Sequence, residues 1–408
     1  MAPEFAVGEY KAKVYSSLDE LSQSEIVAVA NGSGHASLHR PDGMVESRAM
    51  NDSLSSIPRA PELLELPPLA SARKLADTMR EELDVLLSGP IPKYTSEDTS
   101  LVVFGSLARG EWTSAGDLDW TYLIDGQANS DHLRIAQSIR KVLKENEEKF
   151  RAPGQTGTFG NMAFSHDVIH QIGGQADTNR NTTQRILLLL ESAAIGKNTQ
   201  AYERVIRGVI NRYLEEDNHL LIEKETRYRV PRFLLNDIVR FWRTMAVDFA
   251  SKQRDRAGEG WGLRNAKLRM SRKLIFASGL LVCFGCSLDS DLQKKISPEK
   301  SDRKLVLVNY IREQIRLTPL QILARAIEQY SVSKKIGDQL FEAYATFLSL
   351  LDDESSRGSL AKLRAEDSRT DSTFKRVREI SQKFENGLDV LFFENSCLAP
   401  LTRKYGVF

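Results

Sequence analysis

Two aspartates stand one residue apart at the start of an apolar stretch, DLDWTYLI, at residues 117–124. Side chains of a β-strand alternate between its two faces, so Asp117 and Asp119 are expected to project from the same face. Two ionised carboxylates held so close repel each other, and burial raises the pKa of at least one. A divalent cation removes that cost, because Mg²⁺ accepts one or two carboxylates together with water and substrate phosphates.

A second feature lies just upstream, where the apolar run TSLVVF ends in Gly105-Ser106. A glycine at the end of a strand lets the backbone approach a phosphate closely, and Ser106 can add a hydroxyl donor. A turn that begins there would also offer unpaired backbone N–H groups to an anion. The order along the chain is therefore a phosphate cradle, a loop and a pair of metal ligands.

The whole stretch FGSLARGEWTSAGDLDWTYL resembles the signature of the DNA-polymerase-β-type nucleotidyltransferase superfamily. In that signature an apolar residue and Gly-Ser are often followed by Ala-Arg-Gly-Glu, then by two aspartates separated by one apolar residue. Gly116 replaces the serine that frequently precedes the first aspartate. The resemblance covers about twenty residues.

This resemblance implies a nucleoside triphosphate substrate bound at Gly105 and Ser106, and Arg109 of the same motif is predicted to join them. It implies that Asp117 and Asp119 hold Mg²⁺ or Mn²⁺, with two ions expected. Two ions about 4 Å apart can stabilise both the attacking and the leaving oxygens of an in-line displacement. The predicted reaction transfers a nucleoside monophosphate to an acceptor hydroxyl and releases pyrophosphate.

Active members of the superfamily usually carry a third carboxylate on the strand after the connecting helix. Asp167, in SHDVIHQI after the helix expected at 131–149, is the favoured catalytic and metal-binding residue, with Glu148 and Asp177 as competitors. The rival interpretation is a catalytically inactive module that binds a nucleotide, and it gains weight if none of the three reaches the metal.

A basic segment at 252–273 holds eight Lys or Arg and two acidic residues in a chain of net charge +1. On an α-helix beginning near Leu263, Arg264, Lys267 and Ser271 share one face, and Arg269 and Arg272 lie on others. Arg264 and Lys267 are therefore predicted to bind the nucleotide. The alternative is a solvated basic helix face.

Charged residues also interrupt the apolar helical segment NDIVRFWRTMAVDFASK. Asp237 and Arg240 are spaced three apart and can pair on a helix. A buried structural network is favoured for this segment, and Arg243 is its best candidate for nucleotide binding.

Two other patterns could bind metal. His166 and His170 have the spacing of metal ligands on a helix, but no glutamate follows His166 as in the metalloprotease pattern, so a polar or surface role is favoured. Cys283 and Cys286 form a CxxC within an apolar run, and buried helix packing is favoured over redox or metal use.

The expected architecture is an α/β nucleotidyltransferase core, a short mixed sheet with flanking helices, followed by an α-helical domain. The predicted parts are an N-terminal segment and Pro-rich linker (1–71), the catalytic core (72–178) and the substrate-binding helical domain (179–408). SIPRAPELLELPPLA is expected to be extended, and DDESSRGSLAKLRAEDSRTDS to be an exposed connection. Helices are predicted at 181–196, 200–216, 231–252, 264–284, 303–315, 319–331, 334–351 and 373–392.

The charge balance, the cysteine count and the length of the apolar runs are typical of a soluble intracellular protein. The counts of Lys+Arg (56) and Asp+Glu (55) are nearly equal, so no global field attracts nucleic acid or a membrane. Three cysteines suit a reducing compartment, no apolar run approaches the ~20 residues of a membrane span, and no leader peptide is evident. A cytoplasmic protein with no membrane partner is expected.

The acceptor is left open between a nucleotide, a nucleic acid and a protein hydroxyl. By analogy with bacterial antiviral defence and signalling members of the superfamily, nucleotide or oligonucleotide synthesis is favoured. Protein nucleotidylylation comes second. RAPGQTGTFG and RILLLLESAAIGK are weakly similar to parts of the protein-modifying nucleotidyltransferases that regulate glutamine synthetase.

Overall fold

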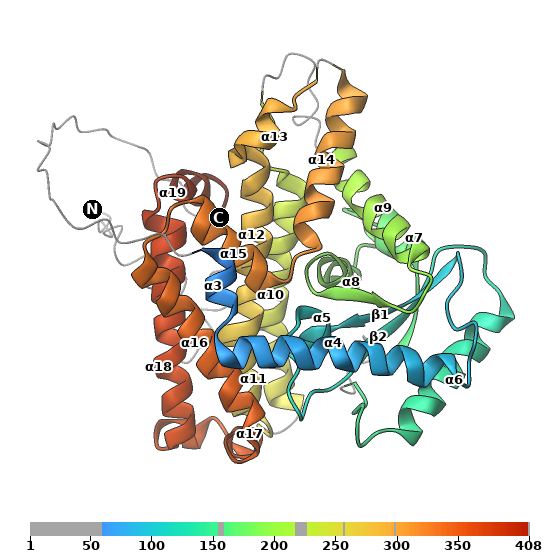
Figure 1. Cartoon of the computed structure of the whole chain (residues 1–408), viewed down its shortest axis with the longest axis horizontal. Coiled ribbons are helices and arrows are strands. Elements are labelled where there is room, and N and C mark those ends of the chain that lie inside the picture. Colours follow the sequence, from blue (N-terminus) through green and yellow to red (C-terminus); the bar gives the residue numbers. More distant parts are fainter. Residues whose placement is uncertain (1–58, 154–158, 217–226, 256–257, 298, 407–408) are drawn as a thin grey trace, which may run out of the picture. The chain divides into compact units, whose positions relative to one another are not determined.

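The structure is a computed structural model that describes residues 59–153, 159–216, 227–255, 258–297 and 299–406 (Figure 1). All of them belong to one compact unit, residues 54–407. The sequence-predicted N-terminal segment lies outside the described residues up to position 58. The described part combines a small sheet with many helices, so both kinds of structure expected from the sequence are present.

The sheet has four strands in the order β3-β2-β1-β4: β1 (Thr99–Phe104), β2 (Asp119–Ile124), β3 (Asn161–Phe164) and β4 (Ser192–Ile195). Strands β2 and β4 run antiparallel to β1, and β3 runs parallel to β2. The two strands that flank the signature are confirmed. Strand β4 was expected to be part of a helix, and its presence carries the sheet beyond residue 178.

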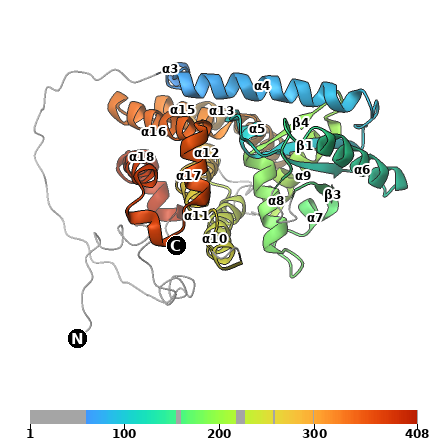
Figure 2. The same ribbon diagram turned by 90° about the horizontal axis from the view of Figure 1, so that it is seen from below.

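Strand β1 is buried on both faces, which explains its unbroken apolar sequence. Leu101 and Val103 pack in one core cluster with α4 and α6, whereas Val102 and Phe104 pack in a larger cluster with α8 and α9. Figure 2 shows α4 on one side of the sheet and α8 on the other. These helices span Pro67–Ser88 (α4), Ser130–Glu145 (α6), Asn179–Leu190 (α8) and Gln200–Glu216 (α9).

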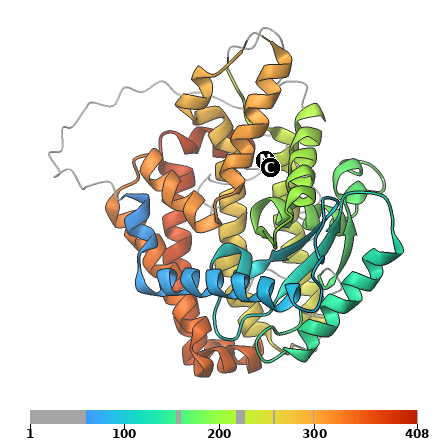
Figure 3. The ribbon, with the colours of Figure 1, turned by 45° about the vertical axis from the view of Figure 1, so that its right-hand side comes forward.

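Helices continue almost without interruption after residue 227, as the helical periodicity predicts. Helix α4, blue in Figure 3, runs from this helical region to the sheet and packs on α16. The elements are α10 (Arg232–Asp255), α11 (Trp261–Lys267), the π-helical turn η2 (Leu268–Arg272), α12 (Lys273–Leu288), α13 (Ser290–Lys294), α14 (Lys300–Ile315), α15 (Pro319–Gln329), α16 (Lys334–Asp352), α17 (Glu354–Lys362), the 3₁₀ turn η3 (Glu366–Arg369), α18 (Ser372–Asp389), the π-helical turn η4 (Val390–Glu394), α19 (Leu398–Leu401) and the π-helical turn η5 (Thr402–Gly406).

The run Trp261–Lys294 is long and apolar enough to cross a membrane, but 72% of its most apolar window is buried inside the protein. It contains α12, whose residues from Leu274 to Cys286 are all buried. Cys283 and Cys286 lie there as buried thiols, in agreement with the packing role expected for them. The segment is therefore packed like the core helix of a soluble protein.

The Pro-rich stretch at 56–70 is not extended where the structure describes it. It forms α3 (Ala60–Leu64) and the start of α4 at Pro67. Pro61 is the second residue of α3, and Pro67 and Pro68 are the first two residues of α4. At these positions a missing N–H costs nothing and the fixed φ suits the helix. Here the prolines begin helices.

The polar stretch at 352–372 also differs from the expected exposed connection, because it contains α17 and η3. The carboxylate of Asp353 caps α17 by accepting from the Ser356 N–H at 2.7 Å, and Leu360 is buried. An N-cap and one apolar anchor are enough to order a helix that packs against α11 and α16.

Candidate active site

The aspartate pair lies where strand β2 begins. Phe104, the last residue of β1, pairs with Asp119, and Gly105 follows directly. Gly105 has φ +68°, and a Cβ atom built on it would lie 3.2 Å from Oδ2 of Asp119. Only glycine fits both the left-handed backbone and the close carboxylate. Asp117 precedes the strand and forms an isolated parallel bridge with Arg151.

Ser106 is the second residue of the short helix α5 (Gly105–Arg109) and is half-buried. The structure thus brings four of the predicted residues, Gly105, Ser106, Asp117 and Asp119, to one end of the sheet.

The ionised form of the Asp119 carboxyl is energetically costly at this position. The pKa of this carboxyl is raised to about 6, mainly by burial. The nearby carboxylates of Glu191 and Asp117 add to the rise, and the charges of Arg272 and Lys267 oppose it. Bound cationic charge would therefore be stabilised beside Asp119. That is the electrostatic setting expected of a metal-binding carboxylate.

Three basic side chains from the helical region surround the aspartates. Burial lowers the pKa of Lys267, which interacts electrostatically with Asp117 and Asp119. Burial likewise lowers the pKa of Arg357, whose main favourable partner is Asp117. Lys267, Arg357 and Arg272 therefore place three positive charges close to the two carboxylates.

The π-helical turn η2 explains how Lys267 and Arg272 reach the same place. Residues five apart on an α-helix lie about 140° apart around its axis. A π-helix bonds residue i to residue i+5, so residues five apart lie on the same side. Arg264 and Lys267 lie three residues apart on α11, before the π-helical turn. Arg264 donates from Nη1 to the Glu259 carbonyl oxygen at 2.5 Å.

Helices α16 and α17 also hold the loop that precedes Asp117. The Ser114 N–H donates to Oδ1 of Asp352 at 3.1 Å, and its hydroxyl donates to the same oxygen at 3.3 Å. Nη2 of Arg357 donates to the carbonyl oxygen of Ala115. Arg357 thus contacts the loop while its charge faces Asp117. Arg357 was not predicted as a site residue because residues 352–372 were expected to form an exposed connection. Asp353, a typical N-cap residue, was the local signal for a helix there.

Arg109 was predicted to bind nucleotide, but the structure gives it a different environment. It is buried, and its Nε and Nη2 donate to Oε2 of Glu111 at 2.9 and 2.7 Å. Its Nη1 donates to Oε2 of Glu191. Oε1 of Glu191 accepts from Nη1 of Arg272 at 2.9 Å. The guanidinium of Arg109 is therefore used in structural ion pairs. Glu191 binds both Arg109 and Arg272, and so connects this buried pair to the site.

The structure does not bring Asp167 to the aspartate pair. Asp167 lies on α7 (Ser165–His170), directly after β3, with its side chain exposed. The end of β3 pairs with Ile124. Ile124 is five residues along β2 from Asp119, roughly 17 Å at the usual rise per residue.

The two competitors for the third acid are also elsewhere. Glu148 is exposed, and Asp177 is buried in a separate ion network. Across the described ranges, no group of three or more His, Cys, Asp and Glu side chains is placed to hold a metal.

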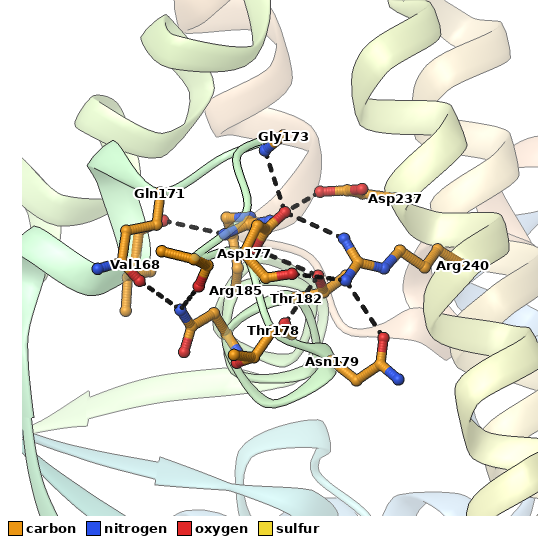
Figure 4. Close-up of polar contacts among 12 residues, drawn as sticks. Val168, Gln171, Gly173, Asp177, Thr178, Asn179, Thr182, Arg185, Asp237 and Arg240 are labelled. Carbon is orange, nitrogen blue, oxygen red and sulfur yellow. Dashed lines mark hydrogen bonds and ion pairs between the residues drawn. The ribbon is translucent and has the colours of Figure 1, made fainter.

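The Asp177 network ties α8 and α10 to the loop after α7 (Figure 4). Nη2 of Arg185 lies 3.0 Å from Oδ2 of Asp177 and 2.8 Å from Oδ2 of Asp237, and Nη1 of Arg240 donates to Asp177 at 3.0 Å. Asp237 and Arg240 thus take separate partners. The network fits the structural role favoured for this helix. Arg243 is exposed on α10, and no described ion pair joins it to the aspartates of the site.

The sequence matches no protein-family model and no curated protein.

Proposed function

We propose that the chain is a metal-dependent nucleotidyltransferase whose site is formed by the start of β2 and three cations of the helical region. The observation that carries the proposal is the position of Asp117 and Asp119, beside Gly105 and facing Lys267, Arg272 and Arg357. Arg272 pairs with Glu191, but no described ion pair joins Lys267, Arg272 or Arg357 directly to Asp117 or Asp119. Such an arrangement suits a ligand that carries a metal and several phosphates.

The two aspartates fit a hard divalent cation. Their oxygens are the ligands that Mg²⁺ prefers, and Mg²⁺ commonly binds one or two carboxylates and fills its other positions with water and phosphate oxygens. The raised pKa of Asp119 indicates that Arg272 and Lys267 do not fully offset the cost of burying this carboxylate. One ion needs no third acid, whereas a two-ion site would need a ligand that the described residues do not provide.

The cations fit the phosphates. Arginine presents several donors to phosphate oxygens and lysine contributes a compact charge. Lys267, Arg272 and Arg357 would bind the triphosphate and neutralise the pyrophosphate as it leaves, while Gly105 leaves room for the chain of phosphates. Bound Mg²⁺ would supply Lewis-acid stabilisation of the negative charge that develops in transfer. The acceptor hydroxyl attacks the α-phosphorus, and the bond to the pyrophosphate oxygen breaks.

Incubation with each labelled NTP and dNTP, in Mg²⁺ or Mn²⁺, tests the proposal and identifies the acceptor. Free oligonucleotides indicate signal synthesis, which the superfamily resemblance favours, and labelled protein indicates nucleotidylylation. Asp119→Asn is expected to abolish incorporation because it removes a metal-binding charge. Asp248→Asn, which changes an exposed aspartate of α10, is the matched control. Incorporation by Asp119→Asn at the wild-type rate would refute the assignment.

A second function is favoured by a specific observation: in the described ranges no group of three or more His, Cys, Asp and Glu side chains is placed to hold a metal. Glu191, the other acid near Asp119, is paired with Arg109 and Arg272. On this alternative the chain binds a nucleotide and does not transfer it. Calorimetric titration with NTP and Mg²⁺ separates the two: binding without incorporation under any metal supports the inactive module. Absence of both binding and incorporation would contradict both functions.

A further inference from the structure

The histidine pair on α7 lies far along the sheet from the aspartates and is not used by the proposed reaction. His166 and His170 stand on successive turns, with ring centroids 5.2 Å apart and ring planes tilted by 47°. Both side chains are exposed, so an ion from solvent can reach them. A zinc ion held at about 2.0–2.1 Å by one nitrogen of each ring, at a tetrahedral angle, places the two centroids roughly 5 Å apart. The observed spacing is therefore that of two imidazoles on one ion.

The helix that carries the pair is firmly packed on its other side. Val168 is buried with 4% exposure. Ile169 packs so tightly on α9 that a Cβ atom built on Gly208 would lie 2.8 Å from its Cδ1. A fixed backbone keeps both rings on one face, so little ordering entropy opposes chelation.

A chain of polar contacts places a carboxylate beside His166. Nδ2 of Asn181, at the start of α8, donates to Oε1 of Gln171 at 2.6 Å. Nε2 of Gln171 donates to Oδ1 of Asp167 at 3.1 Å, and that oxygen lies 3.6 Å from Nδ1 of His166. Figure 4 labels Gln171 beside the Asp177 network, so these polar contacts begin next to a buried ion network. Carboxylates beside metal-binding imidazoles commonly orient the ring, and Asp167 is placed to do so for His166.

We propose that His166 and His170 form a binding site for a borderline divalent cation, of which Zn²⁺ is the clearest case, with Asp167 orienting His166. Imidazole nitrogen suits Zn²⁺, Cu²⁺ and Ni²⁺, whereas Mg²⁺ prefers oxygen. Water or an external ligand completes the coordination, because no third protein ligand lies with the pair in the described ranges. The site does not depend on the proposed nucleotidyl transfer.

Calorimetric titration of the untagged full chain with ZnCl₂, in excess Mg²⁺ to occupy oxygen ligands, tests this site. His166→Ala and His170→Ala should each weaken one zinc-binding event at least tenfold, and Asp167→Asn should weaken it by a smaller factor. Because all three side chains are exposed, the variants should unfold at the wild-type temperature, which thermal denaturation checks.

The chain offers a matched control. His35 and His39 have the same spacing and lie outside the described residues. The double replacement His35→Ala/His39→Ala should leave the zinc-binding event intact. Loss of that event in the control, or its persistence in both α7 variants, would overturn the proposal. X-ray absorption should show two imidazole nitrogens on the ion, and one or none would also overturn it.

Discussion

At the scale of single residues, the site depends on a glycine that the motif requires and on carboxylates whose charges are costly. Gly105 combines a left-handed backbone with a close approach to Asp119. Asp119 is half-buried and lies near two other acids, so nearby cations are what stabilises its ionised form. The left-handed backbone costs little at glycine, whereas the ionised Asp119 reduces the stability of the metal-free protein.

Gly105→Ala should lower the free energy of unfolding by about 1 kcal/mol, because φ +68° is unfavourable for alanine. It should also reduce nucleotide incorporation, because the added methyl group lies against the Asp119 carboxylate. Gly173→Ala is the control, since its φ is +77° and nothing lies within 4 Å of its Cβ position. Urea denaturation should give similar losses for both, with incorporation lost only in Gly105→Ala. Equal activity of the two variants would contradict the role of the close approach.

The raised pKa of Asp119 predicts a pH-dependent stability. A carboxyl with a folded pKa of about 6, above the usual unfolded value near 4, binds its proton more tightly in the folded state. The ionised group therefore destabilises the fold above pH 6, and this cost is relieved as pH falls through 6 towards 4. Asp119→Asn should be more stable than the wild type at pH 7, by on the order of 2 kcal/mol, and the difference should vanish near pH 4.

Metal-free urea denaturation of both proteins across this pH range measures the difference. Addition of Mg²⁺ at pH 7 should stabilise the wild type and leave Asp119→Asn unchanged. A stability difference that does not depend on pH would show that Asp119 is ionised in the folded protein without cost.

At the scale of elements, two short segments decide the chemistry of the site. The π-helical turn η2 aligns Lys267 with Arg272, which an uninterrupted α-helix would separate. Helix α17 brings Arg357 to the loop before Asp117. Glu191, at the junction of α8 and β4, holds Arg272 in place. Lys267 of α11, Arg272 of η2 and Arg357 of α17 are the three cations, so the proposed phosphate site combines two stretches that are distant in sequence.

Arg357→Ala should raise KM for the nucleoside triphosphate and loosen the loop, because it removes a phosphate-binding charge and the contact to Ala115. The expected rise is about tenfold or more, corresponding to one charge-assisted hydrogen bond of roughly 1.5–3 kcal/mol. Lys362→Ala, an exposed change on the same helix, controls for altered surface charge. Steady-state kinetics with each variant measure the effect. An Arg357→Ala enzyme that matches Lys362→Ala in KM would exclude Arg357 from substrate binding.

At the scale of the whole molecule, the larger core cluster unites the sheet region with the helical region. It includes Val102 and Phe104 of β1 together with residues of α8, α10 and α12. Gly279 of α12 lies where these helices meet, since its Cβ position is 2.9 Å from Cδ1 of Leu190 and 3.0 Å from Cγ2 of Ile238. This shared core fixes the helices that carry Lys267, Arg272 and Arg357 relative to the strand that carries Asp119.

Gly279→Ala should overpack this junction and lower the free energy of unfolding by about 1–3 kcal/mol. Gly358→Ala on α17 is the matched helical control: nothing lies within 4 Å of its Cβ position, so improved helix propensity should make it neutral or stabilising. Chemical denaturation followed by circular dichroism measures both. If Gly279→Ala is as stable as the wild type, α12 can shift without cost and the junction is looser than its contacts indicate.

The sequence alone determined the features that depend on neighbouring residues. Unbroken apolar runs predicted β1 and β2, and helical periodicity predicted the long helices after residue 227. Motif spacing predicted one site for Gly105, Ser106, Asp117 and Asp119, and these residues lie at one end of the sheet. Local patterns suffice there because strand alternation and helix period are set within a few residues.

Only the tertiary structure decided which distant charges meet those aspartates. It paired Arg109 with Glu111 and Glu191, kept Asp167 at the other end of the sheet, and supplied Arg272 and Arg357. Their positions follow from the packing of α8, α12, α16 and α17 in shared cores, and from a π-helical turn that shifts the face of one helix. Local residue spacing predicts neither this packing nor the π-helical turn. The position of a buried charge depends on its ion-pair partners, and those partners are distant in sequence.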